Sequence, residues 1–290
     1  MIYLTKEDWT NLILSKISDD ESFNQDFLEL NKIYNMINFF SRKLYEKQTS
    51  QFMIFIAAYN LFHKYRLCSN FSFKKYSSEE LYILIGALIV ISQKSVNMLY
   101  KRVDDISTFI KQIINIKNPN LEVDIDTLNK KIIQKEDDIL SFIGFNAEID
   151  SPYFFLNKLK TYLSKFKVNS DNFITLLIYI LKDSFILPLC LYYTPNVLTI
   201  SCVQLLIERH KLNFINIDEL KPLSDYPIYN EEVQQCTLLI KKIEATLDKI
   251  KNQNKNVVKN ETEKDKNREK ANENNASITK VIPSIQMNIE

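Results

Sequence analysis

The segment Leu81–Ser92 reads LYILIGALIVIS, an almost uninterrupted apolar run. A second run of the same kind, Gln51–Tyr65, reads QFMIFIAAYNLFHKY. Neither run alternates apolar and polar residues as a half-buried strand does, and both are long for a strand. A helix that is apolar on nearly every face is one that other helices surround. Together with a glycine count of only two in 290 residues, the runs predict an all-α fold in which these segments are the central helices.

Amphipathic segments precede and follow these two runs. Helices are expected over Lys6–Ile17, from about Ser22 to Leu44, over Arg102–Ile116 and over Asp124–Phe142. Ser77 or Ser78 is the expected cap of the helix that contains Leu81–Ser92, because a serine hydroxyl can accept a hydrogen bond from the first turn. In the same way, Asp124 or Asp126 is expected to cap the last of these helices.

A second group of helices is expected to begin at Pro152, because proline suits the first turn of a helix and disfavours the α conformation in the residue before it. These helices are expected over Tyr153–Phe166, Asp171–Leu187, Pro195–Lys211 and Glu231–Ile250. The segment Ser201–Lys211 is similar to Leu84–Lys94: both are apolar, have small residues early and end on a basic residue. This similarity suggests a duplicated helical domain.

The tail, residues 251–290, differs in composition from the rest of the chain. It carries 8 Lys or Arg, 6 Asp or Glu and 9 Asn, with few large apolar residues before Ile278. Such a segment cannot bury enough apolar surface to offset the entropy of ordering. We therefore predict a disordered polar tail.

Composition excludes several classes of function. Gly86 and Gly144 are too few for the glycine-rich loops that bind nucleotides. The two histidines lie far apart and the four cysteines form no CxxC pair, so no metal site and no cofactor are expected. Paired aspartates occur only in charged helical segments or caps, and no nucleophile stands at a useful spacing from His63 or His210. The sequence therefore predicts no catalytic residue and a non-enzymatic protein.

The charge balance argues against two kinds of partner. A net charge of +1, from 37 basic and 36 acidic residues, gives no overall field to hold a nucleic acid or an anionic membrane. The loop Phe71–Tyr76 interleaves aromatics with lysines, but such a loop more often packs its rings back onto the domain.

The apolar stretch Phe173–Tyr193 carries Lys182-Asp183 at its middle, which favours a buried helix over a membrane span. With no secretory leader at the start of the sequence, an intracellular protein with reduced thiols is expected.

Two stretches resemble the cyclin box. The first is Gly86–Lys94 with its continuation Lys101–Ile106. The second is Ile133–Asn146, which reads IQKEDDILSFIGFN and is followed by PYFFL over Pro152–Leu156. Its pattern, E-x-x-[IL]-L-x-x-[IL]-x-F-[DN] running into P-Y-x-F-L, is most similar to the transcription-type cyclins K, T and L. The resemblance covers about residues 20–250.

The resemblance implies a domain organisation. Two tandem five-helix cyclin boxes are expected, the first over residues 21–148 and the second over residues 149–250. A flanking N-terminal helix is expected over residues 1–20, and the disordered tail over residues 251–290. In the family, the first box binds a cyclin-dependent protein kinase, so a kinase heterodimer is the expected assembly.

The resemblance also implies which residues bind the kinase. In the family, a lysine that ends the third helix and a glutamate in the fifth form hydrogen bonds with the kinase backbone just before its regulatory αC helix. These positions fall on Lys94 and Glu136. Charge-assisted bonds of this kind supply orientation as well as affinity. The apolar residues that face the αC helix fall on Ile91, Leu140 and Phe145.

The sequence departs from the family at several positions nearby. Ser95 and Ala147 are smaller than the usual residues at positions facing the αC helix. Val96 and Asn97 replace the two acidic residues that commonly follow the lysine. The Met-Arg-Ala-Ile-Leu motif, which carries the substrate-docking patch of cell-cycle cyclins, does not occur near Ile37–Leu44.

The function implied is that of a cyclin, a regulatory subunit that binds and activates a cyclin-dependent kinase. From the similarity to cyclins K, T and L, the expected process is phosphorylation of the RNA polymerase II tail or of splicing machinery, with transcription or splicing proteins as further partners. The expected location is the nucleus, with the cytoplasm as a second location. The alternative is a cyclin-fold adaptor or scaffold protein that activates no kinase. Transcription factor IIB is of that type, but it has a zinc ribbon and a basic surface that this sequence lacks.

Overall fold

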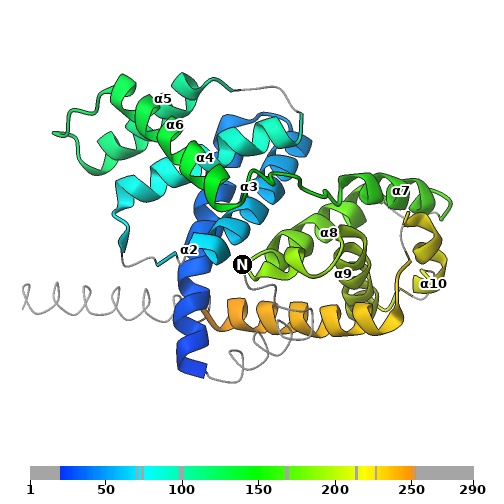
Figure 1. The fold of residues 1–290 in the computed structure, drawn as a ribbon. Helices are drawn as coiled ribbons and strands as arrows, with labels where there is room; N and C mark the ends of the chain where they lie inside the picture. The colour runs from blue at the N-terminus through cyan, green and yellow to red at the C-terminus, as the bar shows by residue number, and fades with distance from the viewer. Residues whose placement is uncertain are drawn as a thin grey trace, which may run out of the picture. The chain divides into compact units, whose positions relative to one another are not determined.

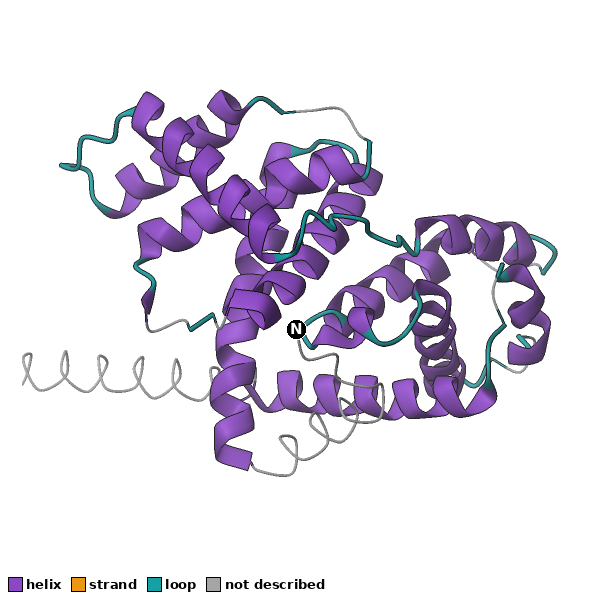
Figure 2. Cartoon of the chain, viewed as in Figure 1, coloured by secondary structure: helices purple, strands orange, loops and turns teal. Residues whose placement is uncertain are grey.

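In the computed structural model, the described residues are 20–69, 71–72, 75–97, 101–166, 170–212, 215–225, 227–250 and 252. Within these ranges the regular elements are all helical, joined by loops and turns (Figure 2). The all-α class predicted from the sequence is therefore confirmed. The expected helix over Lys6–Ile17 and the predicted tail lie outside the described residues, apart from Asn252.

Five helices form the first set. They are α2 (Asp20–Leu44), α3 (Gln48–Ser69), α4 (Ser78–Ser95), α5 (Val103–Lys117) and α6 (Ile125–Phe142). In Figure 1 they gather into one group, and α4 contacts each of the other four. Every residue of α4 from Leu81 to Gln93 is buried, as is most of α3. The two apolar runs of the sequence are therefore central helices, as predicted.

The start of α4 is fixed by a complete capping box. The Ser77 hydroxyl accepts a hydrogen bond from the Glu80 backbone N–H at 3.2 Å, and the Ser77 N–H donates to the Glu80 carboxylate at 2.7 Å. These bonds satisfy amides that the first turn of a helix leaves unpaired. Of the two caps proposed from the sequence, Ser77 is the one that the structure shows. Asp124 likewise caps α6, through a 2.9 Å bond from the Thr127 N–H.

Gly86 allows α4 to lie close to its neighbours. A methyl group built on this residue would lie 3.1 Å from the Ile110 Cδ1 atom, 3.3 Å from the Ile106 Cγ2 atom and 3.4 Å from the Ile132 Cδ1 atom. Ile106 and Ile110 lie on α5, and Ile132 lies on α6. The absence of a side chain at Gly86 therefore sets how closely α5 and α6 pack against α4.

A second set of helices follows the linker after α6. It contains α7 (Tyr153–Leu163), α8 (Ser170–Ser184), the 3-10 turn η2 (Pro188–Leu191), α9 (Pro195–His210), α10 (Ile217–Leu220) and the 3-10 turn η3 (Lys221–Leu223); residues 230–250 are also helical. Here α9 is the buried central helix and contacts α7, α8, η2 and α10. The Ser201 hydroxyl also donates to the Val233 carbonyl at 3.2 Å, so residues 230–241 pack on α9.

Two helices of this set end three residues earlier than predicted: the helix predicted over Tyr153–Phe166 is α7, which ends at Leu163 before a turn, and α8 is the second. The sequence predicted a helix over Asp171–Leu187, whereas α8 ends at Ser184. Pro188 disfavours the α conformation in Leu187, whose φ of −93° and ψ of 158° are extended. The Ser184 hydroxyl donates a hydrogen bond to the Leu181 carbonyl at 2.7 Å, and three turn residues lead into η2.

Among the described residues, no helix has both the length and the apolar character to cross a membrane.

Buried polar contacts join the two sets. The Nε2 atom of His63 on α3 lies 2.8 Å from the Phe185 carbonyl oxygen, which accepts its hydrogen bond. Burial lowers the pKa of His63 to about 3, so the ring is neutral. The Tyr34 hydroxyl on α2 donates to the Asp183 carboxylate at 2.8 Å, and burial followed by the Asp183 charge raises the pKa of Tyr34.

The chain divides into two compact units, residues 1–241 and residues 242–290. Both helical sets described above, up to Lys241, belong to the first unit. In the second unit, the described residues 242–250 and 252 are helical. The boundaries predicted after residues 20, 148 and 250 stay predictions.

Candidate protein-binding site

The packing of α4 against α6 brings Lys94 and Glu136 together. Lys94 lies in the last turn of α4, and Glu136 lies in the middle of α6. Their side chains form a salt bridge, with the Lys94 ammonium donating to the Glu136 carboxylate. Lys94 and Glu136 are separated by 41 residues in the sequence. The sequence analysis selected both, and the fold brings them together at one place on the surface.

The two partners of this salt bridge differ in their access to water. The Glu136 side chain is only 9% exposed, whereas the Lys94 side chain is 58% exposed. A carboxylate that has lost most of its water needs a charged or hydrogen-bonding partner. Lys94 supplies one, and its ammonium has donors to spare, because it carries three N–H groups. The pair can thus present donors to a carbonyl group and a carboxylate oxygen to an amide group of another molecule.

The three predicted apolar residues differ in exposure. Ile91 is only 2% exposed and belongs to the core of the first set. Leu140 is half-buried, and Phe145 is 72% exposed. Leu140 and Phe145 are therefore the two of these three residues that keep surface available to a partner.

Phe145 has an unusual backbone conformation. It follows Gly144, and both residues have positive φ angles, 62° for Gly144 and 59° for Phe145. The Phe145 N–H donates to the Leu140 carbonyl at 2.7 Å, which closes the end of α6. A bulky residue in the left-handed region costs about 1–2 kcal/mol. The fold thus holds an aromatic ring out into water in a strained conformation, a combination that is common at binding sites.

Phe142 is an exposed aromatic residue that the sequence analysis did not select. It is 48% exposed, and its ring lies edge-on to the Tyr65 ring with centroids 5.7 Å apart. Phe142 occupies an unspecified position of the cyclin-box pattern, so the pattern gave no reason to single it out. Its place in the last turn of α6, before Gly144, is the signal that could have found it.

Three of the residues that depart from the family pattern follow Lys94 directly in the sequence. Ser95 bonds back to the Ile91 carbonyl at 3.0 Å, and Asn97 has a φ of 52°. Ser95, Val96 and Asn97 line a cleft of about 580 Å³ that also borders the start of α7 and the start of α9. Ala147 is half-buried in the linker.

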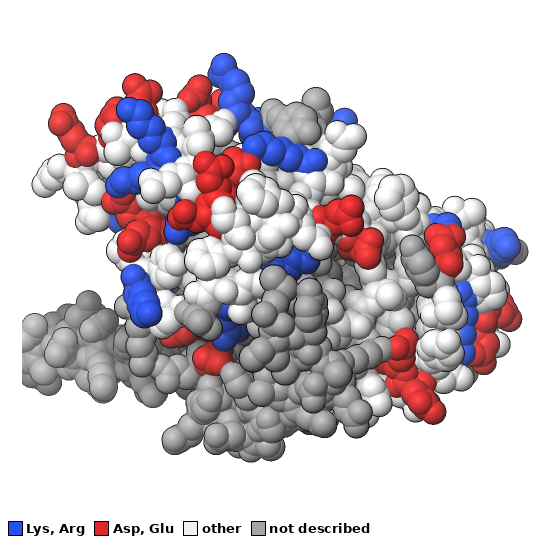
Figure 3. Space-filling view, viewed as in Figure 1, with Lys and Arg blue, Asp and Glu red and all other residues white. Residues whose placement is uncertain are grey.

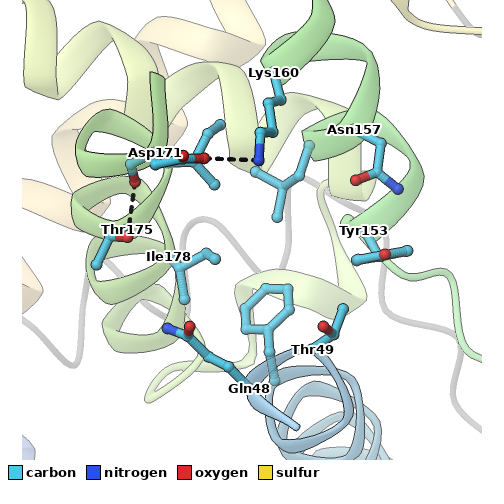
Figure 4. Close-up of a pocket in the computed structure, with 11 residues that line it drawn as sticks. Gln48, Thr49, Tyr153, Asn157, Lys160, Asp171, Thr175 and Ile178 are labelled. Carbon is cyan, nitrogen blue, oxygen red and sulfur yellow. Dashed lines mark hydrogen bonds and ion pairs between the residues drawn. The ribbon is translucent and has the colours of Figure 1, made fainter. Parts of the chain in front are cut away.

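A second hollow, of about 360 Å³, lies between the start of α3 and the helices α7 and α8 (Figure 4). Its two charged side chains neutralise each other, because the Lys160 ammonium lies 2.7 Å from the Asp171 carboxylate. Thr175 donates to the Asp171 backbone carbonyl at 2.8 Å. The close-up shows amide, hydroxyl and apolar groups around the Lys160–Asp171 ion pair. Among the residues drawn there, no nucleophilic side chain contacts a side-chain base.

The structure also bears on the aromatic residues at Phe71 and Tyr76, on the surface charges and on metal-binding side chains. The ring of Phe71 packs against Tyr76 with centroids 4.7 Å apart and against Phe62 of α3 at 5.5 Å, so Phe71 lies against the domain. Acidic and basic side chains are interspersed on the face shown in Figure 3. Within the described ranges, no group of three or more His, Cys, Asp or Glu side chains is placed to hold a metal ion.

No model of a known protein family matches this chain, and a search of curated proteins finds no significant match. The cyclin-box resemblance therefore stays a prediction that rests on the residues that carry it.

Proposed function

We propose that this chain is a cyclin, a non-catalytic regulatory subunit that binds and activates a cyclin-dependent protein kinase. The observation that carries the proposal is the meeting of Lys94 and Glu136 at the surface between α4 and α6. The exposed, strained Phe145, which follows the end of α6, supplies an apolar anchor in this proposal. Exposed aromatic side chains are enriched among the residues that contribute most to the affinity of protein interfaces.

The mechanism is a shift in the conformational population of the kinase. Protein kinases transfer phosphate only when a glutamate of the αC helix pairs with a lysine of the neighbouring strand. A partner that binds the inward position of the αC helix more tightly than the outward one favours the active state. In this proposal Lys94 donates to backbone carbonyls and Glu136 accepts from backbone amides just before αC, while Leu140 and Phe145 contact the helix itself.

The proposal includes two tandem cyclin boxes. Five helices around α4 are followed by a second set around α9, which supports this arrangement. In the alignment that places Leu84 opposite Ser201, the cap Ser77 falls opposite Thr194. Thr194 caps α9 through a 3.3 Å bond from the Val197 N–H. The central helices of the two sets thus begin at matching positions, as a duplicated domain requires.

By the same resemblance, we expect a nuclear protein that acts on transcription or RNA processing through phosphorylation of the RNA polymerase II tail or of splicing proteins. The second candidate function is a cyclin-fold adaptor that activates no kinase. The burial of Ile91 and the small or uncharged residues Ser95, Val96 and Asn97 favour this candidate, because they reduce the contact that the αC helix would make.

The decisive experiment is a charge swap, Lys94→Glu with Glu136→Lys. The swap keeps an ion pair between α4 and α6 but reverses the charges offered to a partner. The matched control is Glu208→Lys with Lys241→Glu, which swaps an ion pair of the second set. Tagged wild-type and variant chains are purified from their own cells, partners are identified by mass spectrometry, and kinase activity is assayed on a polymerase tail peptide.

Recovery of one stoichiometric kinase with the wild type and the control, and its loss from the Lys94/Glu136 swap, is the expected result. Circular dichroism of each variant verifies that its fold is intact. Equal kinase recovery with both swaps would refute the assigned residues. Recovery of transcription or scaffold proteins without any kinase would favour the adaptor.

A further inference from the structure

The cleft of about 580 Å³, called here the linker cleft, lies where the first helical set meets the second. The end of α4 forms one side, the linker before α7 forms another, and the start of α9 closes it. Its lining includes Asn97, Asp150, Phe154, Asn196 and Asp225. A volume of this size accommodates several side chains, not a single ion.

The linker that forms one wall of the cleft is held in place by Lys64 of α3. The Lys64 ammonium donates to the Asn146 carbonyl at 3.3 Å and to the Glu148 carbonyl at 2.8 Å. Burial lowers the pKa of Lys64, and the charges of Asp150 and Glu148 partly oppose this effect. The Asp150 carboxylate is therefore carried by a fixed segment of backbone, and a fixed wall lowers the entropy cost of binding.

The cleft is lined by carboxylates that a partner can reach. Asp150 is exposed, and among the described residues no cation lies within ion-pair distance of it. Asp225 pairs with Lys158 at 2.8 Å, but the Asp225 side chain is 77% exposed. An ion pair with this much exposure contributes little and exchanges easily.

An exposed aromatic ring lies in the same cleft. Phe154, in the first turn of α7, is 71% exposed, and its ring meets the Tyr153 ring edge-on with centroids 6.1 Å apart. A cation over an aromatic face is attracted by the ring, and a guanidinium group can also stack on it. The Asn196 side-chain amide donates to the Ser224 hydroxyl at 2.6 Å. Each asparagine amide has two N–H donors and one oxygen acceptor, so Asn196 and Asn97 together have further groups that suit a peptide backbone.

We propose that the linker cleft binds an extended peptide segment of a protein partner through an arginine or lysine side chain. The cation pairs with Asp150 and Asp225 and lies against the Phe154 ring, while the asparagine amides bond to the backbone of the segment. Charge complementarity selects this occupant, because the ionisable side chains of the lining are both carboxylates. The proposal concerns a site separate from the Lys94–Glu136 pair and does not depend on whether a kinase binds there.

The test uses fluorescence anisotropy with the full chain. The probe is a short labelled peptide of arginine, serine and proline, and the matched probe has each arginine replaced by glutamate. We expect the arginine peptide to bind and the glutamate peptide not to bind. The double substitution Asp150→Asn with Asp225→Asn should weaken binding about tenfold or more, and Phe154→Ala should weaken it several-fold.

The charge-matched control is Glu122→Gln with Asp126→Asn, two exposed residues in the loop before α6 and in its first turn. This variant should bind the arginine peptide as the wild type does. An equal loss in the control and the cleft variant would show nonspecific attraction to the acidic surface and would overturn the proposal. Absence of binding to the arginine peptide, or equal binding of the glutamate peptide, would also overturn it.

Discussion

The two helical sets each use an ion pair to join their central helix to a later helix, but the two pairs differ in burial. In the first set, Glu136 is 9% exposed and Lys94 is 58% exposed. In the second set, Glu208 of α9 lies 2.5 Å from Lys241, and these side chains are 41% and 43% exposed. The second pair has the character of ordinary surface charge.

The burial of Glu136 makes the first ion pair the more costly of the two. Burying a carboxylate costs more free energy than a well-packed apolar residue at the same place. The second set shows that a helical set of this kind holds together with a solvent-exposed pair. The buried carboxylate of Glu136 is therefore a costly way to join two helices, and its presence supports a role in recognising a partner.

The largest effect is expected in the middle of the central helices. Gly86→Leu should lower the free energy of unfolding by about 3 kcal/mol or more, because the added atoms meet Ile106, Ile110 and Ile132. Val203 is the aligned residue of α9 and is fully buried. Val203→Leu should cost about 1 kcal/mol, because it adds one methylene to a residue already packed. Denaturant unfolding of the two variants measures both values, and equal losses would contradict the special role of Gly86.

The ion pairs themselves should respond unequally. Lys94→Ala leaves the buried Glu136 carboxylate without its cation, so we expect a loss of about 2 kcal/mol. Lys241→Ala leaves an exposed carboxylate and should cost less than about 1 kcal/mol. Thermal or denaturant unfolding of the two variants compares them. Equal losses in the two variants would contradict the expectation that the buried Glu136 carboxylate depends more on its cation than the exposed Glu208 carboxylate does.

The buried histidine that links the two sets predicts a pH dependence. His63 has a pKa of about 3 in the folded chain, against an ordinary value of 6.5. As the pH falls below about 6.5, the unfolded chain binds a proton that the folded chain does not, so stability is complete above that pH and decreases toward pH 3. Between pH 7 and pH 5 the loss should be about 2 kcal/mol.

His63→Gln should reduce this slope, whereas His210→Gln, at an exposed position, should retain it. Urea unfolding at several pH values gives the slope for each variant. An unchanged slope in His63→Gln would show that other groups cause the pH dependence.

The smallest effects are expected at the helix caps. Ser77 belongs to a complete capping box, whereas Thr194 makes a single 3.3 Å bond. Ser77→Ala should therefore cost about 1 kcal/mol and Thr194→Ala about 0.5 kcal/mol. Differential scanning calorimetry of the two variants should place the Ser77→Ala midpoint lower, and the reverse order would contradict the ranking.

The helices were largely predictable because their signals are local. The apolar runs gave α3 and α4, the serine and aspartate caps marked the starts of α4 and α6, and Pro195 marked the start of α9. Local signals were weaker at the end of α8, where the apolar run continues past Ser184. The end of α8 depends on Pro188 and on the packing of η2 against α3. This packing could not be predicted locally, because α3 is far from η2 in the sequence.

The candidate site was predictable only in part. The resemblance selected Lys94 and Glu136, and the structure places them together. The resemblance also selected Ile91, which the structure shows to be buried. The sequence could not reveal this, because α4 is apolar on every face and the pattern does not show which face reaches the surface. The linker cleft was not predicted, because its walls come from α4, the linker and α9, and no periodicity connects them.

The bond between His63 and Phe185 also bears on how the chain is made. A chain emerging from the ribosome completes α2–α6 well before residue 185 is added. Until then, the side of α3 that packs on η2 is exposed to solvent, and the His63 imidazole lacks the Phe185 carbonyl that it binds in the folded chain. Nascent segments with apolar surface of this kind aggregate or engage chaperones. We therefore expect chains truncated between Phe142 and Phe185 to be retained by chaperones, and release to follow once η2 has emerged from the ribosome.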